Sequence, residues 1–184
     1  MSACWRPCAN STGWRPTWCS RGGRARRSSW RAPTAREVGK LTDVVCGPGN
    51  QAAAISSGSY PVDGMIIAPC SMKSVAGIRT GCADGLIGRA VDVTLKERRR
   101  LVLAARDPAE RNPFGEPARL SQMGAVVLPP TPAFYTNPAS TGDLVEHTVA
   151  RILDQFALPA PHTRRWKGLA AARADLNALP QPGD

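Results

Sequence analysis

Two serines and a lysine stand close together in the segment Ser71–Ser74, directly after an apolar run. If a helix begins here, the hydroxyls of Ser71 and Ser74, the ammonium of Lys73 and the first free helix N–H groups can converge on one phosphate. The same residues also suit a plain helix cap, in which one serine caps the helix and Lys73 is solvated. The segment therefore indicates either an anion site or an ordinary helix start.

Two further side chains with binding chemistry follow later apolar runs. Arg106 comes directly after Leu101–Ala105, and Tyr135 stands in a proline-rich loop after Ala125–Leu128. A guanidinium can bind a phosphate through paired hydrogen bonds, and a tyrosine hydroxyl can donate one to a ligand. An arginine at a strand end is also a common surface residue, and an aromatic residue in such a loop can serve packing alone. Neither residue identifies a site by itself.

The elements that must position these side chains are short apolar runs separated by helical segments. The runs are Met65–Ala68, which Pro69 ends, Leu101–Ala105 and Ala125–Leu128. Runs without polar alternation are typical of strands buried on both faces. Val75–Thr80 and Leu86–Lys96 have helical character, so the order predicts an α/β fold with a parallel sheet. We expect Ser71, Arg106 and Tyr135 to converge at the carboxyl edge of this sheet, where such folds bind ligands.

One more helix is predicted near the C-terminus. Ser140 and Asp143 have the spacing of a capping box. Apolar side chains then recur on one helical stripe, at Leu144, Val145, Val149, Ile152, Leu153 and Phe156. We expect this helix to cover the sheet. Beyond Pro159 the Ala-rich and Pro-rich tail predicts a partly helical, frayed end.

The first forty residues differ from the rest in charge and in pattern. The chain of 184 residues carries a net charge of +10, and residues 1–40 hold nine Arg and Lys against a single acid, Glu37. Four of the five tryptophans fall in the first thirty residues, without helical or strand periodicity, so no packed element is predicted there. Such a basic segment raises nucleic-acid binding through residues 1–40 as an alternative function.

Compartment and metal chemistry are constrained by what the chain lacks. No apolar run reaches the length of a membrane span, and no secretory signal pattern is present. We therefore expect a cytoplasmic protein without a membrane partner, and reduced thiols for the six cysteines. Cys4, Cys8 and Cys19 lack paired knuckle spacing, and His147 and His162 are distant in sequence, so no metal site is predicted.

Long stretches of the chain together resemble one known family. These stretches are residues 53–59, 64–78, 89–99, 124–135, 143–145 and 151–155, and they include Ala-Pro-Cys-Ser-Met-Lys-Ser and Leu-Pro-Pro-Thr-Pro-Ala-Phe-Tyr. They resemble the UbiX-type flavin prenyltransferases almost residue for residue. The resemblance implies a Rossmann-like, flavodoxin-like α/β fold, in which a parallel sheet is flanked by helices.

The resemblance also implies an activity and its partners. Members of this family join the dimethylallyl group of dimethylallyl monophosphate to reduced FMN, and the prenylated FMN serves a UbiD-type decarboxylase. By position, the FMN-binding residues are Ser71, Met72, Lys73, Ser74 and Arg106. The prenyl phosphate is assigned to Tyr135, Arg151 and Trp166, the last of which resembles a tryptophan that closes the site of a neighbouring subunit. The family further implies a homo-oligomer and no metal, whereas a relic flavoprotein that holds FMN without catalysis is the alternative.

Two segments depart from the family. Its first strand and the Gly-rich turn that cradles the FMN phosphate are missing or scrambled here. Three prolines between Arg106 and Leu120 predict that the family's helix in this region is lost. The resemblance implies Tyr135, Arg151 and Gln122 as the catalytic residues. Gln122 stands where the family often has a catalytic Glu, so a carboxylate is removed from proton transfer.

A change of reading frame explains both departures, and we state it as a hypothesis for residues 2–33 and 107–118. Trp-Arg occurs at Trp5, Trp14 and Trp30, and its codons encode Leu-Glu or Val-Glu in the neighbouring frame. With permitted codons, residues 5–19 reread as a helix running into a strand, and residues 108–117 reread close to the family's own segment. The predicted organisation is therefore an irregular segment 1–36, a flavoprotein domain 37–166 and a tail 167–184.

Overall fold

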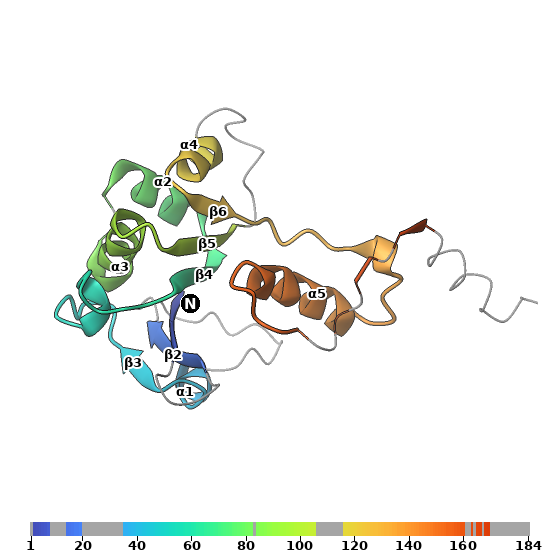
Figure 1. Ribbon diagram of the computed structural model, residues 1–184, viewed down its shortest axis with the longest axis horizontal. Coiled ribbons are helices and arrows are strands. Elements are labelled where there is room, and N and C mark those ends of the chain that lie inside the picture. The colour runs from blue at the N-terminus through green and yellow to red at the C-terminus, as the bar shows by residue number, and fades with distance from the viewer. Residues whose placement is uncertain are drawn as a thin grey trace, which may run out of the picture. The chain divides into compact units, whose positions relative to one another are not determined.

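The computed structural model describes residues 2–7, 14–19, 35–105 without residue 83, 116–160, and the single positions 163, 165, 166, 168 and 169. Figure 1 shows the elements in chain order. The chain divides into two compact units, Met1–Pro130 and Thr131–Asp184, and each is described by itself. Within the described residues, no helix is both long and apolar enough to cross a membrane.

The three predicted strands form the parallel part of the sheet in the first unit. They are β4 (Gly64–Cys70), β5 (Arg100–Ala105) and β6 (Ala125–Val127), paired in that order. Pro69 does not end β4 as expected. Proline cannot donate to a ladder, yet β4 continues through it to Cys70, because the pairing with β5 shifts between Ile67 and Cys70. The parallel α/β arrangement is confirmed.

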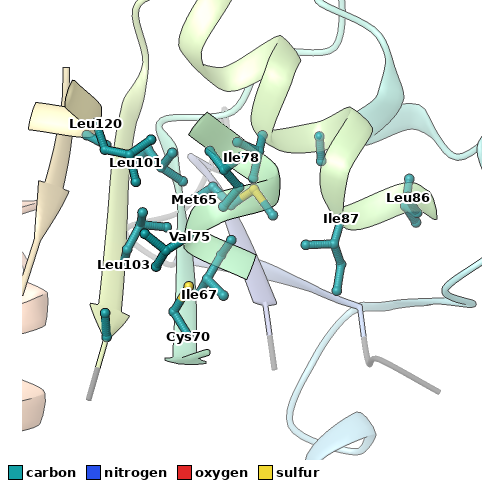
Figure 2. Packing of buried hydrophobic residues seen from close by; sticks show 14 of the residues in the cluster. Met65, Ile67, Cys70, Val75, Ile78, Leu86, Ile87, Leu101, Leu103 and Leu120 are labelled. Carbon is teal, nitrogen blue, oxygen red and sulfur yellow. The ribbon is translucent and has the colours of Figure 1, made fainter. Parts of the chain in front are cut away.

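Helices α2 (Met72–Thr80) and α3 (Gly85–Lys96) connect β4 to β5, and both confirm the helical segments expected between these strands. Figure 2 shows how their apolar side chains meet the sheet. Met65 and Leu101 belong to one core cluster with Val75 of α2 and Leu86 of α3. Strand side chains on the other face of the sheet, such as Val102, are buried too, as expected for strands covered on both faces.

Helix α4 (Glu116–Gln122) precedes β6 and corrects one expectation. The prolines before Leu120 predicted no helix, but Pro117 is the second residue of α4, in the first turn, where its missing N–H breaks no helical hydrogen bond. Leu120 is fully buried in the core between the helices and the sheet. The predicted loss of helix from residue 106 to 115 lies outside the described residues.

The N-terminal residues also contain elements that the sequence did not predict. Strands β1 (Ser2–Pro7) and β2 (Trp14–Cys19) lie inside a six-stranded sheet of order β3-β2-β1-β4-β5-β6. The expectation of no packed element is therefore wrong for these two segments. It relied on side-chain periodicity, whereas the backbone edge of β4 offers pairing groups to any extended chain. Helix α1 (Ala35–Gly39) and the edge strand β3 (Val44–Cys46) follow.

Strand direction is uniform in this sheet apart from β1. Strand β1 is antiparallel to both of its neighbours, β2 and β4, and β2 pairs with β3 in parallel. It follows that β2, β3, β4, β5 and β6 all run the same way. Their carboxyl ends therefore lie at the same end of the sheet. Ser2, the first residue of β1, lies toward that end as well, because β1 is antiparallel to β4 and Ser2 pairs with Ile67.

The loop that follows β3 is fixed to helix α3. It contains the short 3-10 helix η1 (Ala54–Ser56). Arg99 donates to the carbonyls of Gly58 at 2.7 Å and of Tyr60 at 2.9 Å. Leu86 N donates to the Pro48 carbonyl at 2.9 Å, so the start of α3 holds the start of the loop.

The second unit contains η2 (Phe134–Thr136) and helix α5 (Thr141–Asp154). The capping box is confirmed: the Ser140 hydroxyl accepts from Asp143 N at 3.2 Å, and the Asp143 carboxylate accepts from Ser140 N at 3.1 Å. The predicted apolar stripe is only partly buried. Ile152 is buried, but Val145 and Val149 are exposed. That α5 covers the sheet stays a prediction.

Candidate functional site

The predicted anion segment lies at the carboxyl end of β4, where α2 begins. Ser71 is the N-cap of α2, and its hydroxyl accepts a hydrogen bond from Ser74 N at 3.3 Å. The two serine hydroxyl oxygens are 2.8 Å apart, and the Ser74 side chain is buried. Val75 N and Ser74 N both donate to the Ser71 carbonyl. The capping interpretation of this segment is therefore confirmed, with both serines in one network.

The cap leaves binding groups at this helix end. The N–H groups of Met72 and Lys73 have no acceptor within the helix, because the first turn of a helix has none to offer. The Met72 side chain packs against the core, so its backbone is the part available to a ligand. The Lys73 side chain is exposed. Helix N–H groups, a hydroxyl pair and an ammonium can together bind one phosphate, so capping and anion binding are compatible.

Other groups at the same sheet edge are two thiols and the strand ends around them. Cys46 ends β3 and Cys70 ends β4, and both are buried free thiols. Burial raises the pKa of the Cys46 thiol, which keeps it protonated and poorly nucleophilic at neutral pH. Cys46 is therefore a poor candidate for a nucleophile. Arg106, which is also predicted to bind FMN, lies outside the described residues.

Within one chain, Gln122 lies far from the predicted anion-binding residues Ser71–Ser74. It ends α4, just before β6 begins, so it lies near the amino ends of the parallel strands. Ser71 lies at the carboxyl ends of the same strands, at the opposite edge. Gln122 instead lines a cavity of about 390 Å³ with Arg79, Arg119 and Met123. Within one chain Gln122 and Ser71 therefore lie at opposite ends of the sheet, and the catalytic role of Gln122 stays a prediction.

The second unit brings Tyr135 and Trp166 together. Their rings are 6.1 Å apart between centroids and meet edge to face at 87°. His147 of α5 makes a contact of the same distance and angle with Tyr135. Such edge-to-face pairs are favourable beyond the area that they bury. Trp166, expected at a neighbouring subunit's site, thus packs on a tyrosine of its own chain.

Arg151 belongs to a cluster of charges at the end of α5 that the sequence analysis did not identify. Asp154 accepts from both terminal nitrogens of Arg165, at 3.0 and 2.6 Å. The nearest nitrogen of Arg151 is 3.4 Å from the same carboxylate. The two arginines lie fourteen positions apart along the chain, and neither helical nor strand periodicity connects them. Only the reversal of the chain after α5 brings them to one carboxylate.

This cluster has a clear electrostatic effect. Hydrogen bonds from Arg165 lower the pKa of Asp154 below its ordinary value, with the charges of Arg165 and Arg151 acting in the same direction against partial burial. The Asp154 hydrogen bond likewise raises the pKa of Arg165. Asp154 is thus an anion, and Arg165 is a cation, throughout the physiological range. One carboxylate faces two guanidiniums, so the cluster keeps a surplus positive charge.

In the described part of the chain, no group of three or more His, Cys, Asp or Glu side chains is arranged to hold a metal ion. His147 has a buried Nδ1 without a hydrogen-bond partner, and its ring contacts that of Tyr135. The chemistry of the described site residues is that of cations, hydroxyls and helix N–H groups, which bind anions.

Comparison with known proteins identifies the family. The Flavoprotein family model matches residues 35–153. A probable UbiX-like flavin prenyltransferase of Streptomyces sp. (strain D7) is 58% identical over 139 residues, which are 75% of this chain and 70% of that protein.

Two solved structures are similar in fold and in sequence. AnUbiX (PadA1) in complex with FMN and dimethylallyl pyrophosphate has a TM-score of 0.70 at 45% identity, over 73% of this chain and 72% of that one. A dodecameric FMN-dependent Ubix-like decarboxylase from Escherichia coli O157:H7 has a TM-score of 0.70 at 53% identity, over 74% of each chain. On sequence and fold alike, this chain belongs to the UbiX-like flavin prenyltransferase family of flavoproteins.

Proposed function

We propose that this protein is a flavin prenyltransferase, which transfers the dimethylallyl group of dimethylallyl monophosphate to reduced FMN. The observation that carries the proposal is the 58% identity to a UbiX-like flavin prenyltransferase over 139 residues. Ser71–Ser74, Tyr135 and Arg151 all lie within residues 35–153, which the Flavoprotein family model matches. The similar AnUbiX structure holds FMN together with a dimethylallyl ester. Bound reduced FMN supplies an electron-rich ring that accepts the allyl carbon as the phosphate leaves.

FMN binding is assigned to the start of α2. The N–H groups of Met72 and Lys73 and the Lys73 ammonium would bind the anionic part of the cofactor, with the Ser71 and Ser74 hydroxyls beside them. The hydrogen bond between the two hydroxyls fixes their orientation, so little conformational entropy is lost on binding. Arg106 is assigned to the same cofactor by sequence position.

Prenyl phosphate binding is assigned to Tyr135, Arg151 and Trp166. Arg151 has an exposed guanidinium, and a guanidinium can donate paired hydrogen bonds to phosphate oxygens. Charge develops on those oxygens as the carbon–oxygen bond breaks, so donors placed there stabilise the transition state more than the ground state. The rings of Tyr135 and Trp166 offer apolar surface and π-electrons to an allyl group that gains positive character.

Two partners complete the proposal. We assign the prenylated FMN to a UbiD-type decarboxylase, because a modified flavin has value only to an enzyme that uses it as a cofactor. We also assign a homo-oligomer. The related decarboxylase from Escherichia coli O157:H7 is dodecameric, and Val145, Val149 and Phe134 leave apolar surface exposed on the second unit.

The test is to mix the purified protein anaerobically with reduced FMN and dimethylallyl monophosphate, with the diphosphate ester in a parallel reaction. We expect the flavin absorbance spectrum to change and mass spectrometry to find FMN heavier by one isoprene unit. A Tyr135→Phe variant serves as a comparison that removes one hydroxyl donor. Yellow protein that binds FMN but yields no heavier flavin with either ester would identify the relic flavoprotein instead.

A further inference from the structure

Asp154 is linked to the side chains assigned to the prenyl phosphate, directly to Arg151 and through Arg165 to Trp166. It is the last residue of α5 and lies one turn beyond Arg151. Its side chain is only 20% exposed, whereas those of its two arginine partners are more than half exposed. A carboxylate in this position acts on both arginines at once, because both donate to it.

The first connection runs through Arg165 to Trp166. After α5 the chain reverses: Ala157 has a positive φ of 53°, and Leu158 N donates to the Leu153 carbonyl at 3.2 Å. The reversal returns Arg165 to the end of the helix, where it donates to both oxygens of Asp154. Trp166 is the next residue and packs on Tyr135. The ion pair thus fixes the chain one residue away from the aromatic contact.

The second connection runs directly to Arg151. Arg165 takes the two short hydrogen bonds, and Arg151 makes a single longer one of 3.4 Å to the Oδ2 atom. A guanidinium has five N–H donors, so this one contact orients Arg151 and leaves most of its donors for a ligand. Without the carboxylate, two guanidiniums would lie close together with no anion between them, and like charges repel.

We propose that Asp154 is a positioning residue, which holds Arg165 so that Trp166 packs on Tyr135 and which also orients Arg151 toward the prenyl phosphate. This inference rests on the proposed function, since it explains how the residues assigned to one substrate are kept in place. Asp154 itself touches no substrate: an anion beside a phosphate dianion would oppose binding. Its partners are the donors, and the cluster stays positive.

The test begins with wild-type protein that has shown prenyl transfer, so that failure of the proposed function is seen first. Asp154→Asn keeps the shape and removes the charge, and Arg165→Ala removes only the connection to Trp166. We expect Asp154→Asn to raise the KM for dimethylallyl monophosphate about tenfold, because Arg151 and Trp166 both lose their support, while the Kd for FMN stays unchanged. Arg165→Ala should raise the same KM less, and Arg165→Lys should restore part of the loss.

A charge reversal separates the two connections. In the double variant Asp154→Arg with Arg165→Asp, the ion pair re-forms with opposite polarity, but Arg151 now lies beside a cation. The protein is labelled with fluorotryptophan, and the Trp166→Phe variant identifies the fluorine NMR signal of Trp166. We expect this signal to be shifted in the single variants and to return to its wild-type position in the double variant. The KM should stay raised in the double variant. Full recovery of the KM would overturn the role assigned to Arg151. Equal rises in the KM and in the Kd for FMN, with a lower Tm, would show that Asp154 serves stability alone.

Discussion

At the residue scale, Ser71 shows that one side chain can cap a helix and also prepare a ligand site. Its hydroxyl accepts from Ser74 N, as an ordinary N-cap does, and it also contacts the Ser74 hydroxyl. Capping satisfies one free N–H group and leaves those of Met72 and Lys73 at the helix end. The two interpretations that the sequence left open are therefore not alternatives.

We predict that Ser71→Ala weakens both helix and cofactor binding. Loss of the cap should lower the free energy of unfolding by about 1 kcal/mol, and the affinity for FMN should fall about tenfold because a donor to the phosphate is lost. Thr80→Ala is a matched control, since its hydroxyl bonds the Ala76 carbonyl at the other end of α2. Urea unfolding and FMN fluorescence titration measure the two effects. Unchanged FMN affinity in Ser71→Ala would contradict the assignment of the cofactor to this helix end.

At the element scale, the connection between β3 and α3 depends on a residue without a side chain. Gly85, the first residue of α3, has a φ of 74°, and a Cβ there would lie 2.8 Å from the Pro48 carbonyl oxygen. Gly81, which ends α2, has a similar φ of 69°, but no atom lies within 4 Å of the position of its Cβ. An alanine at Gly81 would therefore introduce backbone strain alone, whereas an alanine at Gly85 would introduce backbone strain and steric overlap.

We expect Gly85→Ala to cost more stability than Gly81→Ala. Backbone strain alone should cost about 1 kcal/mol at Gly81, whereas the overlap with Pro48 should bring the cost at Gly85 to about 2–3 kcal/mol. The free energy of unfolding, measured with urea on both variants, checks the difference. Equal losses would mean that the loop after β3 shifts freely to make room, which its bonds to Arg99 and Leu86 argue against.

The elements that the sequence predicted correctly are those with a strong pattern of their own. The apolar runs at β4, β5 and β6 and the capping box of α5 depend on local chemistry, and the structure has all four. Strands β1 and β2 have no such pattern and depend on pairing with other strands, β1 with β4 and β2 with β1 and β3, which a local pattern cannot encode. The contact of Asp154 with Arg165 was missed for the same reason. It forms across a chain reversal, and spacing rules extend over only a few residues.

At the scale of the whole molecule, the N-terminal strand pair is chemically unlike the rest of the sheet. Pro7 and Pro16 lie in β1 and β2, which are both inner strands, although proline is normally confined to edge strands because it cannot donate to a ladder. These two prolines support the proposal that residues 2–33 are translated from a shifted reading frame.

We predict that resequencing the gene finds frame changes that flank residues 2–33 and 107–118. A chain with residues 5–19 and 108–117 replaced by the reread segments should then have a higher Tm and retain more FMN, because the prolines leave the inner strands. Thermal unfolding and the flavin content of purified protein measure this. An intact DNA frame that encodes the printed residues would refute the proposal, and the basic N-terminus would then be a genuine part of the sheet.

The antiparallel direction of β1 has a practical consequence for work with this protein. Because Ser2 pairs with Ile67, anything fused ahead of Ser2 emerges at the sheet edge that holds Ser71. An affinity tag or a bulky fusion partner at that position would crowd the start of α2, to which we assign FMN binding. Purification handles and surface immobilisation for binding assays are therefore better placed elsewhere, or removed by a protease before any flavin titration.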